Sequence, residues 1–143
     1  MDRDRARDVV VAAAVAGVVS GAPSTLHALL TRRRPIEATL AAGTMLLPRE
    51  SRSVPLALAA VPVHAALSLG WAGVLGAVLP ARRAAGAGAA AGLVIAALDL
   101  GVVGRRVPRI RALPQVPQVA DHVAFGLVVG WVLARRRAAR RAA

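Results

Sequence analysis

Long apolar blocks separated by short arginine clusters are the dominant pattern of this chain. Four blocks are long enough to cross a membrane, and they predict helices over about 9–30, 54–79, 84–103 and 117–134. A helix rises about 1.5 Å per residue, so about 20 apolar residues are needed to cross a hydrocarbon core of roughly 30 Å. The sequence therefore predicts an all-α fold, a single membrane domain over residues 1–143 built as an integral bundle of about four transmembrane helices.

The segment at 36–47 is apolar but short. At about 1.5 Å per residue it would be only about 18 Å long, so we expect it to lie at the interface or to re-enter the membrane without crossing it. Four spans place both chain ends on one side, here called the terminal side. The other side, called the loop side, carries the longer connections at 31–53 and 104–116. Ten arginines fall on the terminal side and nine on the loop side, so only the dense C-terminal cluster favours chain ends inside the cell.

The composition supports a membrane protein and argues against a nucleic-acid-binding one. Hydrophobic residues make up 57% of the chain and aromatic residues only 2%. The net charge is +12 and every basic residue is arginine, which in a soluble protein would suggest a nucleic-acid partner. The arginines stand between the apolar blocks, as the flanks of membrane helices do, so we expect anionic lipid headgroups as their partners and no nucleic acid. The absence of cysteine excludes disulfides and thiolate chemistry.

Each predicted span contains an ionisable residue that membrane insertion does not require. These candidate site residues are His27, His64, Asp99 and His122, with Asp121 directly before the last. Such groups are costly in lipid and usually face a bundle interior or a water-filled cavity. We therefore predict an intramembrane polar cluster, and in a four-span bundle this cluster opens toward the loop side.

Small residues share helix faces with these ionisable residues. Positions three or four apart lie on one face of a helix, and this spacing links, for example, His64 with Ser68. GAAAG at 88–92 and GLVVG at 126–130 are small-xxx-small motifs, which let helix backbones approach closely in membranes. The predicted helix-packing residues are Gly88, Gly92, Gly126 and Gly130. The bulky residues predicted to face lipid are Leu67, Trp71, Val74, Val78, Leu127 and Trp131.

No motif in the sequence specifies a reaction, so no catalytic residue, metal or cofactor is predicted. His27, Asp121 and His122 could lie at similar depth, but they lack the short spacings typical of metal ligands. GAGAAAG at 86–92 lies inside a predicted span, where helix packing explains it better than dinucleotide binding does. Two interpretations of the polar cluster remain. Hydrogen bonds that hold the helices in register rank first, and a path for protons or ions ranks second.

Two short stretches resemble a known kind of protein. GAPSTLHALL at 21–30 and ADHVAFGLVVGWVL at 120–133 are similar to segments of small, uncharacterised multi-pass membrane proteins of GC-rich bacteria. The resemblance covers the first and last predicted spans. It implies a location in the bacterial inner membrane, and it implies no activity.

The function predicted first is that of a non-enzymatic structural or accessory membrane protein. Its protein partner, a second copy or another membrane protein, stays open. The alternative is a transporter or channel-like carrier of protons, ions or a small solute. The two hypotheses differ in one structural feature: a carrier needs a cavity that connects Asp99 with His64, whereas a structural protein would pack these groups without one.

Overall fold

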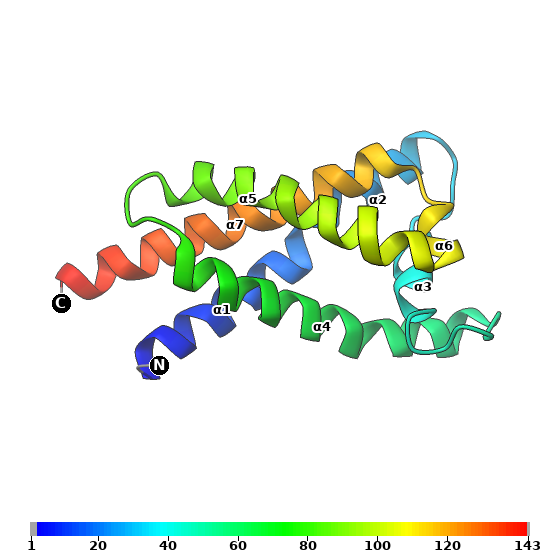
Figure 1. The fold of residues 1–143 in the computed structure, drawn as a ribbon, viewed down its shortest axis with the longest axis horizontal. Coiled ribbons are helices and arrows are strands. Elements are labelled where there is room, and N and C mark those ends of the chain that lie inside the picture. The colour runs from blue at the N-terminus through cyan, green and yellow to red at the C-terminus, as the bar shows by residue number, and fades with distance from the viewer. Residues whose placement is uncertain (1–2, 143) are drawn as a thin grey trace.

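The computed structural model describes residues 3–142, which are helical apart from short connections. The long helices run back and forth along one axis, with the first one broken in two (Figure 1). The elements in chain order are α1 (Arg3–Val19), α2 (Ala22–Leu30), α3 (Glu37–Gly43), α4 (Ser53–Val78), α5 (Ala84–Leu98), the π-helical turn η1 (Asp99–Val103), the 3-10 turn η2 (Gly104–Arg106), α6 (Pro108–Arg111) and α7 (Gln115–Ala142).

Four helical stretches are long and apolar enough to span a membrane, and the first of them is the one that is broken in two. They are Arg3–Leu30, Ser53–Val78, Ala84–Arg106 and Gln115–Ala142. Their best 18-residue windows have mean hydropathies between 1.4 and 1.9. The prediction of an all-α bundle with four candidate membrane spans is confirmed.

Both chain ends lie at one end of the bundle, and α3, α6 and the connections beside them lie at the other (Figure 1). This arrangement matches the terminal side and the loop side as the sequence defines them. Helix α3 has seven residues and so a length of about 10 Å, far short of a membrane span. It packs against the start of α4, and its Leu40 and Ala41 are fully buried. Its depth in the membrane stays a prediction.

Proline affects the first and second spans differently. In the first span α1 ends at Val19 and α2 begins at Ala22, with Pro23 in the first turn of α2. Proline suits this position because its missing N–H would have no helical partner there. Pro62, in contrast, lies inside α4, which continues on both sides of it.

Helices α5 and α7 touch through their glycines. A Cβ atom added to Gly88 would collide with the carbonyl oxygen of Gly126, and one added to Gly126 would collide with that of Gly88. In the same way Gly92 meets the backbone of His122, and Gly130 meets the backbone of Ala84. The two small-xxx-small motifs therefore pack against each other, as a membrane helix pair without bulky side chains can do.

The apolar core fills the half of the bundle nearer the chain ends. It contains Ala12, Ala13, Ala16, Ala72, Leu75, Leu79, Ile95, Phe125, Val129, Val132 and Leu133. An ionic layer lies beyond this core, because Asp8 of α1 pairs with Arg136 and Arg140 of α7. Arg137 donates to the carbonyl oxygens of Gly76 and Leu79 at the end of α4, at 3.1 and 3.2 Å.

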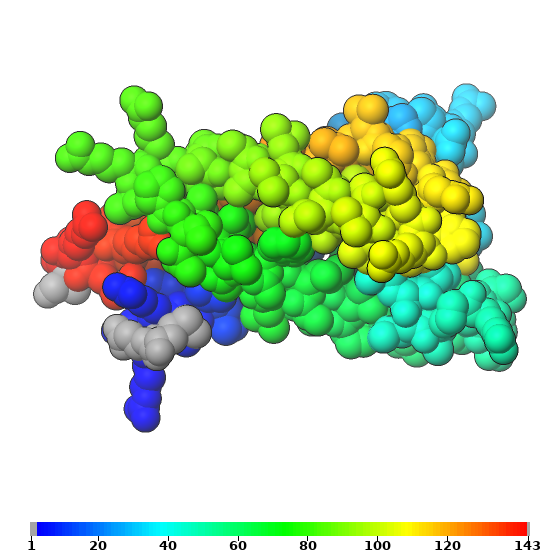
Figure 2. All heavy atoms as spheres, viewed as in Figure 1, coloured from blue at the N-terminus to red at the C-terminus, as the bar shows by residue number. Residues whose placement is uncertain are grey.

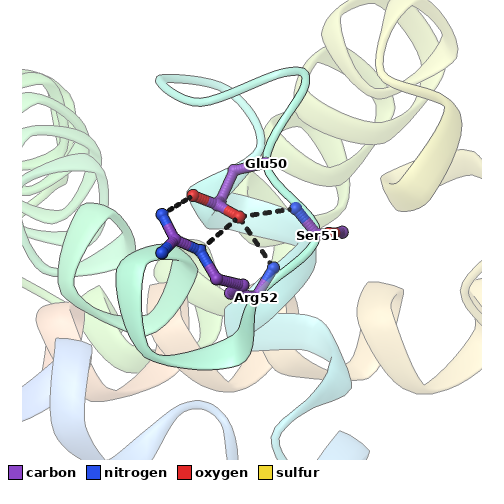
Figure 3. A network of polar contacts seen from close by, with 3 residues as sticks. All are labelled: Glu50, Ser51 and Arg52. Carbon is purple, nitrogen blue, oxygen red and sulfur yellow. Dashed lines mark hydrogen bonds and ion pairs between the residues drawn. The ribbon is translucent and has the colours of Figure 1, made fainter.

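On the loop side a single carboxylate orders the turn that leads into α4 (Figure 3). Glu50 Oε1 accepts the backbone N–H groups of Ser51 at 2.9 Å and Arg52 at 2.8 Å. Arg52 also pairs with Glu50 through its guanidinium, at 2.9 Å from Nη2 to Oε2. The hydrogen bond from the Arg52 side chain, followed by that from its backbone N–H, holds the pKa of Glu50 at about 2, below its ordinary value of 4.5.

Candidate functional site: a polar cavity between the helices

A cavity of about 230 Å³ lies in the loop-side half of the bundle. Every candidate span and the loop-side helices α3 and α6 contribute to its wall. Its polar lining residues are Ser20, Ser24, Thr25, Thr39, His64, Ser68, Trp71, Asp99, Gln118, Asp121 and His122. Hereafter these residues and the space between them are called the polar cavity. The cavity brings together four of the five candidate site residues, His64, Asp99, Asp121 and His122.

Asp99 is the residue on which the contacts of the polar cavity converge. It begins η1, where the α-helical backbone of α5 widens into a π-helical turn, a distortion that is frequent at functional sites. Its Oδ2 atom accepts the indole N–H of Trp71 at 3.0 Å. The same oxygen lies 3.5 Å from Nε2 of His122. Asp99 and His122 keep 19% and 21% of their side chains exposed, so water can reach the pair.

The hydrogen bond at Nδ1 of His122 bears on whether a proton lies between Nε2 of His122 and Oδ2 of Asp99. Nδ1 of His122 is 2.8 Å from the carbonyl oxygen of Gln118, which can only accept, so Nδ1 carries a proton. If Nε2 were unprotonated, its lone pair would face an ionised carboxylate. A proton on Nε2 or on the carboxyl group removes this repulsion. One proton shared between Nε2 and Oδ2 would therefore satisfy both atoms.

Asp121 has a structural partner of its own. Its Oδ1 atom accepts the backbone N–H of Ser24 at 2.9 Å. The first N–H groups of α2 have no helical acceptor because the chain breaks before Ala22. Asp121 thus caps the broken first span from α7, while its side chain also lines the polar cavity.

The α4 residues at the cavity bear on two predictions about the faces of the second span: Ser68 lies as predicted and Trp71 does not. Ser68 faces α1, where a Cβ atom added to Gly17 would lie 3.0 Å from Ser68 Oγ, as the small face of the second span predicts. Trp71 was predicted to face lipid, and this is wrong because its indole donates to Asp99. Leu67 was placed on the same lipid face; it is 38% exposed and also lines the cavity.

The remaining bulky residues do face outward. Val74 and Val78 are 48% and 66% exposed, and Leu127 and Trp131 are 45% and 49% exposed. A signal for Trp71 was present in its chemistry. A buried indole N–H usually finds a hydrogen-bond acceptor, so a tryptophan that faces the interior of a bundle indicates an acceptor nearby.

His27 lies apart from the other candidate residues. It lines a second cavity, of about 320 Å³, with the arginines at 32–34. The two cavities share Ser24 and Gln118 in their walls. A site formed by His27 with Asp121 and His122 is therefore not what the structure assembles. Within residues 3–142 no three His, Asp or Glu side chains converge as ligands of one metal ion would.

The polar cavity is closed toward the chain ends and hollowed toward one side. Ile95 and Phe125 belong both to its wall and to the apolar core beneath it. The space-filling view shows the surface hollowed between α4 and the segment of α5 and η1 (Figure 2). The arrangement can hold a proton or a small polar solute that enters from the loop-side half of the bundle.

Comparisons with protein-family models, with curated proteins and with solved structures found no match to this chain. What can be concluded about its class comes from its own residues. The chain is an all-α protein with four candidate membrane spans and a polar cavity in one half of the bundle.

Proposed function

We propose that this protein is a multi-pass protein of the bacterial inner membrane that carries protons, alone or together with a small polar solute. It performs no enzymatic reaction in this proposal. The observation that supports it is the polar cavity, because its wall includes both Asp99 and His64. A cavity connecting these two residues is the feature that distinguishes a carrier from a structural protein, so it reverses the order in which the sequence ranks them.

The Asp99–His122 pair is the proposed proton-binding site. Its 3.5 Å separation and the fixed Nδ1 proton of His122 leave one proton to be held between Oδ2 and Nε2. When this proton leaves, the two acceptor atoms repel each other, and when a proton returns, the repulsion disappears. Trp71 holds the carboxylate in place from α4 and thereby couples the pair to the helix that borders the cavity opening.

The closed terminal half favours a carrier over an open channel. The apolar core beneath Ile95 and Phe125 separates the polar cavity from the terminal side. A proton bound at Asp99 can reach that side only if the helices move. Transport by alternating access, in which one group of helices moves against another around a central site, fits this geometry.

A structural or accessory role is the second candidate, and the α5–α7 contact favours it. The interlocked glycines at 88, 92, 126 and 130 make a close helix pair that needs no transported solute to explain it. In this role the bonds of Asp99 would serve only to hold α4, η1 and α7 in register. The partner would then be a second copy of the chain or another membrane protein.

Proton uptake by liposomes separates the two candidates. The full chain would be reconstituted into vesicles with a trapped pH-sensitive dye, and a potassium diffusion potential would drive protons inward. We expect wild-type protein to carry protons and Asp99→Asn to abolish the flux. Asparagine keeps an oxygen that can accept the Trp71 N–H, so this variant should fold, but its amide cannot exchange a proton.

The matched control is Glu50→Gln, the same acid-to-amide change in an exposed loop turn outside the cavity. It should carry protons as the wild type does. Thermal unfolding in detergent would establish that all three proteins are folded. A well-folded Asp99→Asn protein with wild-type flux, or wild-type vesicles no more permeable than empty ones, would leave the structural role as the better explanation.

A further inference from the structure

The second cavity, here called the arginine cavity, lies on the loop side between the end of α2 and the start of α7. Its volume is about 320 Å³. Its charged and polar lining residues are Ser24, His27, Arg32, Arg33, Arg34, Glu37 and Gln118. The proposed proton-carrying function uses none of its charged groups.

The charge of this cavity is not balanced from within the protein. Glu37 is its one acidic lining residue, and it already pairs with Arg109 of α6 at 2.8 Å. Arg34 donates to Ser53 Oγ at 3.3 Å. Within residues 3–142 the guanidinium groups of Arg32 and Arg33 have no partner. Two uncompensated cations therefore border the cavity.

The backbone fixes where these two arginines stand. The N–H of Arg33 donates to the carbonyl oxygen of Ala28 at 2.8 Å, and that of Arg32 to the carbonyl oxygen of Leu29 at 3.3 Å. Arg32 has a φ of 55°, which completes the left-handed turn typical of a helix end. The turn places both arginines at the end of the first span, at the expected level of lipid headgroups.

The opposite wall of the cavity adds positive potential. Helix α7 begins at Gln115, and the cavity is lined by Pro117 and Gln118 from its first turn and by Pro114 just before it. The N–H groups of a first turn have no helical acceptor, and the helix dipole makes this end positive. Together with two free guanidinium groups, it forms the surroundings that phosphate groups favour.

We propose that the arginine cavity binds the phosphate group of an anionic phospholipid. Its wall also contains the apolar residues Ala28, Ala112, Leu113 and Pro114, and the nearby Leu29 and Leu30 of α2 are 59% and 76% exposed. Acyl chains attached to the bound phosphate can lie along Leu29 and Leu30. These apolar residues therefore favour a lipid headgroup over free phosphate as the source of the anion.

The test compares two arginine pairs that differ in surroundings but match in chemistry. One variant is Arg32→Asn with Arg33→Gln, and the control is Arg83→Asn with Arg82→Gln. Arg32 and Arg83 both have left-handed backbones, with φ of 55° and 58°, and asparagine tolerates this conformation. Each variant lowers the net charge by the same amount, but Arg82 and Arg83 line neither cavity.

Purified full-length protein in neutral detergent would be titrated with phosphatidylglycerol, phosphatidylcholine or inorganic phosphate, and thermal unfolding would be followed. We expect phosphatidylglycerol alone to raise the Tm of wild-type protein. The cavity variant should bind it at least about tenfold more weakly, and the control within about twofold of wild type. Equal losses in the two variants would indicate nonspecific attraction and overturn the proposal. Inorganic phosphate as effective as the lipid would assign the cavity to a free anion instead.

Because this titration involves no proton flux, its result is independent of the outcome for Asp99. Both variants should unfold at wild-type temperature without lipid, since neither pair makes a side-chain hydrogen bond or ion pair within residues 3–142. If the cavity variant is itself unstable, native mass spectrometry of lipid retained by Arg33→Gln alone decides the question. Retention equal to wild type would then overturn the proposal.

Discussion

The indole N–H of Trp71 donates to Oδ2 of Asp99 at 3.0 Å and connects the C-terminal third of α4 to the π-helical turn at the end of α5. The two residues are 28 positions apart in the chain. Helices α4 and α5 otherwise have few close contacts, since the polar cavity lies between them and the surface is hollowed there (Figure 2). The bond therefore joins two helices that have little other contact.

Replacement of Trp71 tests this bond. Trp71→Phe keeps an aromatic ring but removes the donor, so we expect the free energy of unfolding in detergent to fall by about 0.6–1.7 kcal/mol. Trp131→Phe is the matched control, because Trp131 is 49% exposed and has only Arg135 over its ring, at 5.6 Å from the ring centroid. Equal effects of the two changes would mean that the Trp71–Asp99 bond contributes nothing to stability.

The close glycine contact between α5 and α7 predicts that a single added methyl group lowers the stability of the protein. Gly126→Ala would place a Cβ atom against the backbone of Gly88, where neither backbone can yield without separating the helices. We expect a loss of about 1–3 kcal/mol of stability in detergent, as for other overpacked interfaces. Gly70→Ala is the control, because nothing lies within 4 Å of the added atom. This control should be neutral or slightly stabilising, since alanine favours helix. A Gly126→Ala protein as stable as the Gly70→Ala one would argue against the observed packing of α5 on α7.

Local periodicity explains why the spans and the packing glycines could be predicted. Apolar length identifies a membrane helix, and the four-residue spacing of Gly126 and Gly130 places both on one face before any partner is known. The same reasoning placed Trp71 with Val74 and Val78, because it considers bulk and not the indole N–H. Side-chain volume and hydrogen-bonding capacity pointed in opposite directions at this position, and the hydrogen bond determined the outcome.

The site was predictable only as a set of unusual residues. Asp99, His64 and His122 stand out because ionisable side chains are costly in a membrane span and are rare there. Their grouping depends on contacts between distant parts of the chain. Asp121 meets Ser24 across 97 positions, and no local pattern indicates that a break in the first span needs a cap from the fourth. His27 has the same local signal as the others, yet the break before α2 leaves it on the wall of a different cavity.

The placement of the loops can be tested with cysteines, since the chain has none of its own. Ser51→Cys lies in the turn before α4, and Ala139→Cys lies near the end of α7; both positions are exposed. A membrane-impermeant maleimide added to intact cells should label one of them and not the other until the membrane is permeabilised. The two ends of the bundle in Figure 1 then correspond to the two sides of the membrane. Labelling of both cysteines in intact cells would contradict four spans.

Glu50 gives a prediction for pH dependence. Its pKa in the folded protein is about 2, against an ordinary value of 4.5, so folding favours its ionised form. The stabilising contribution is therefore complete above about pH 4.5 and is lost as the pH falls toward 2. Carbon-13 NMR of the Glu50 carboxyl group in micelles would measure this pKa. Arg52→Gln should raise it toward 4.5, because the Arg52 side chain is the main cause of the shift. An unchanged pKa in that variant would assign the effect to the backbone N–H groups alone.

Among the acidic residues within 3–142, Asp8 has the least exposure, and no pattern in the sequence marks it as a candidate. Only 3% of it is accessible, and it pairs with Arg136 and Arg140 at the end of α7. Asp8→Asn keeps the shape and removes the charge. The two arginine side chains are 35% and 37% exposed, so water can partly replace the lost partner. We therefore expect a loss of about 1–3 kcal/mol in detergent unfolding, less than for a fully buried pair. Glu50→Gln makes the same chemical change beside Arg52, whose side chain is 78% exposed, so it should lower the unfolding temperature less than Asp8→Asn does. The Asp8 effect should also persist in high salt, because salt screens buried pairs much less than exposed ones. If both variants unfold at the wild-type temperature, the ionic layer at the terminal side does not hold α1 to α7.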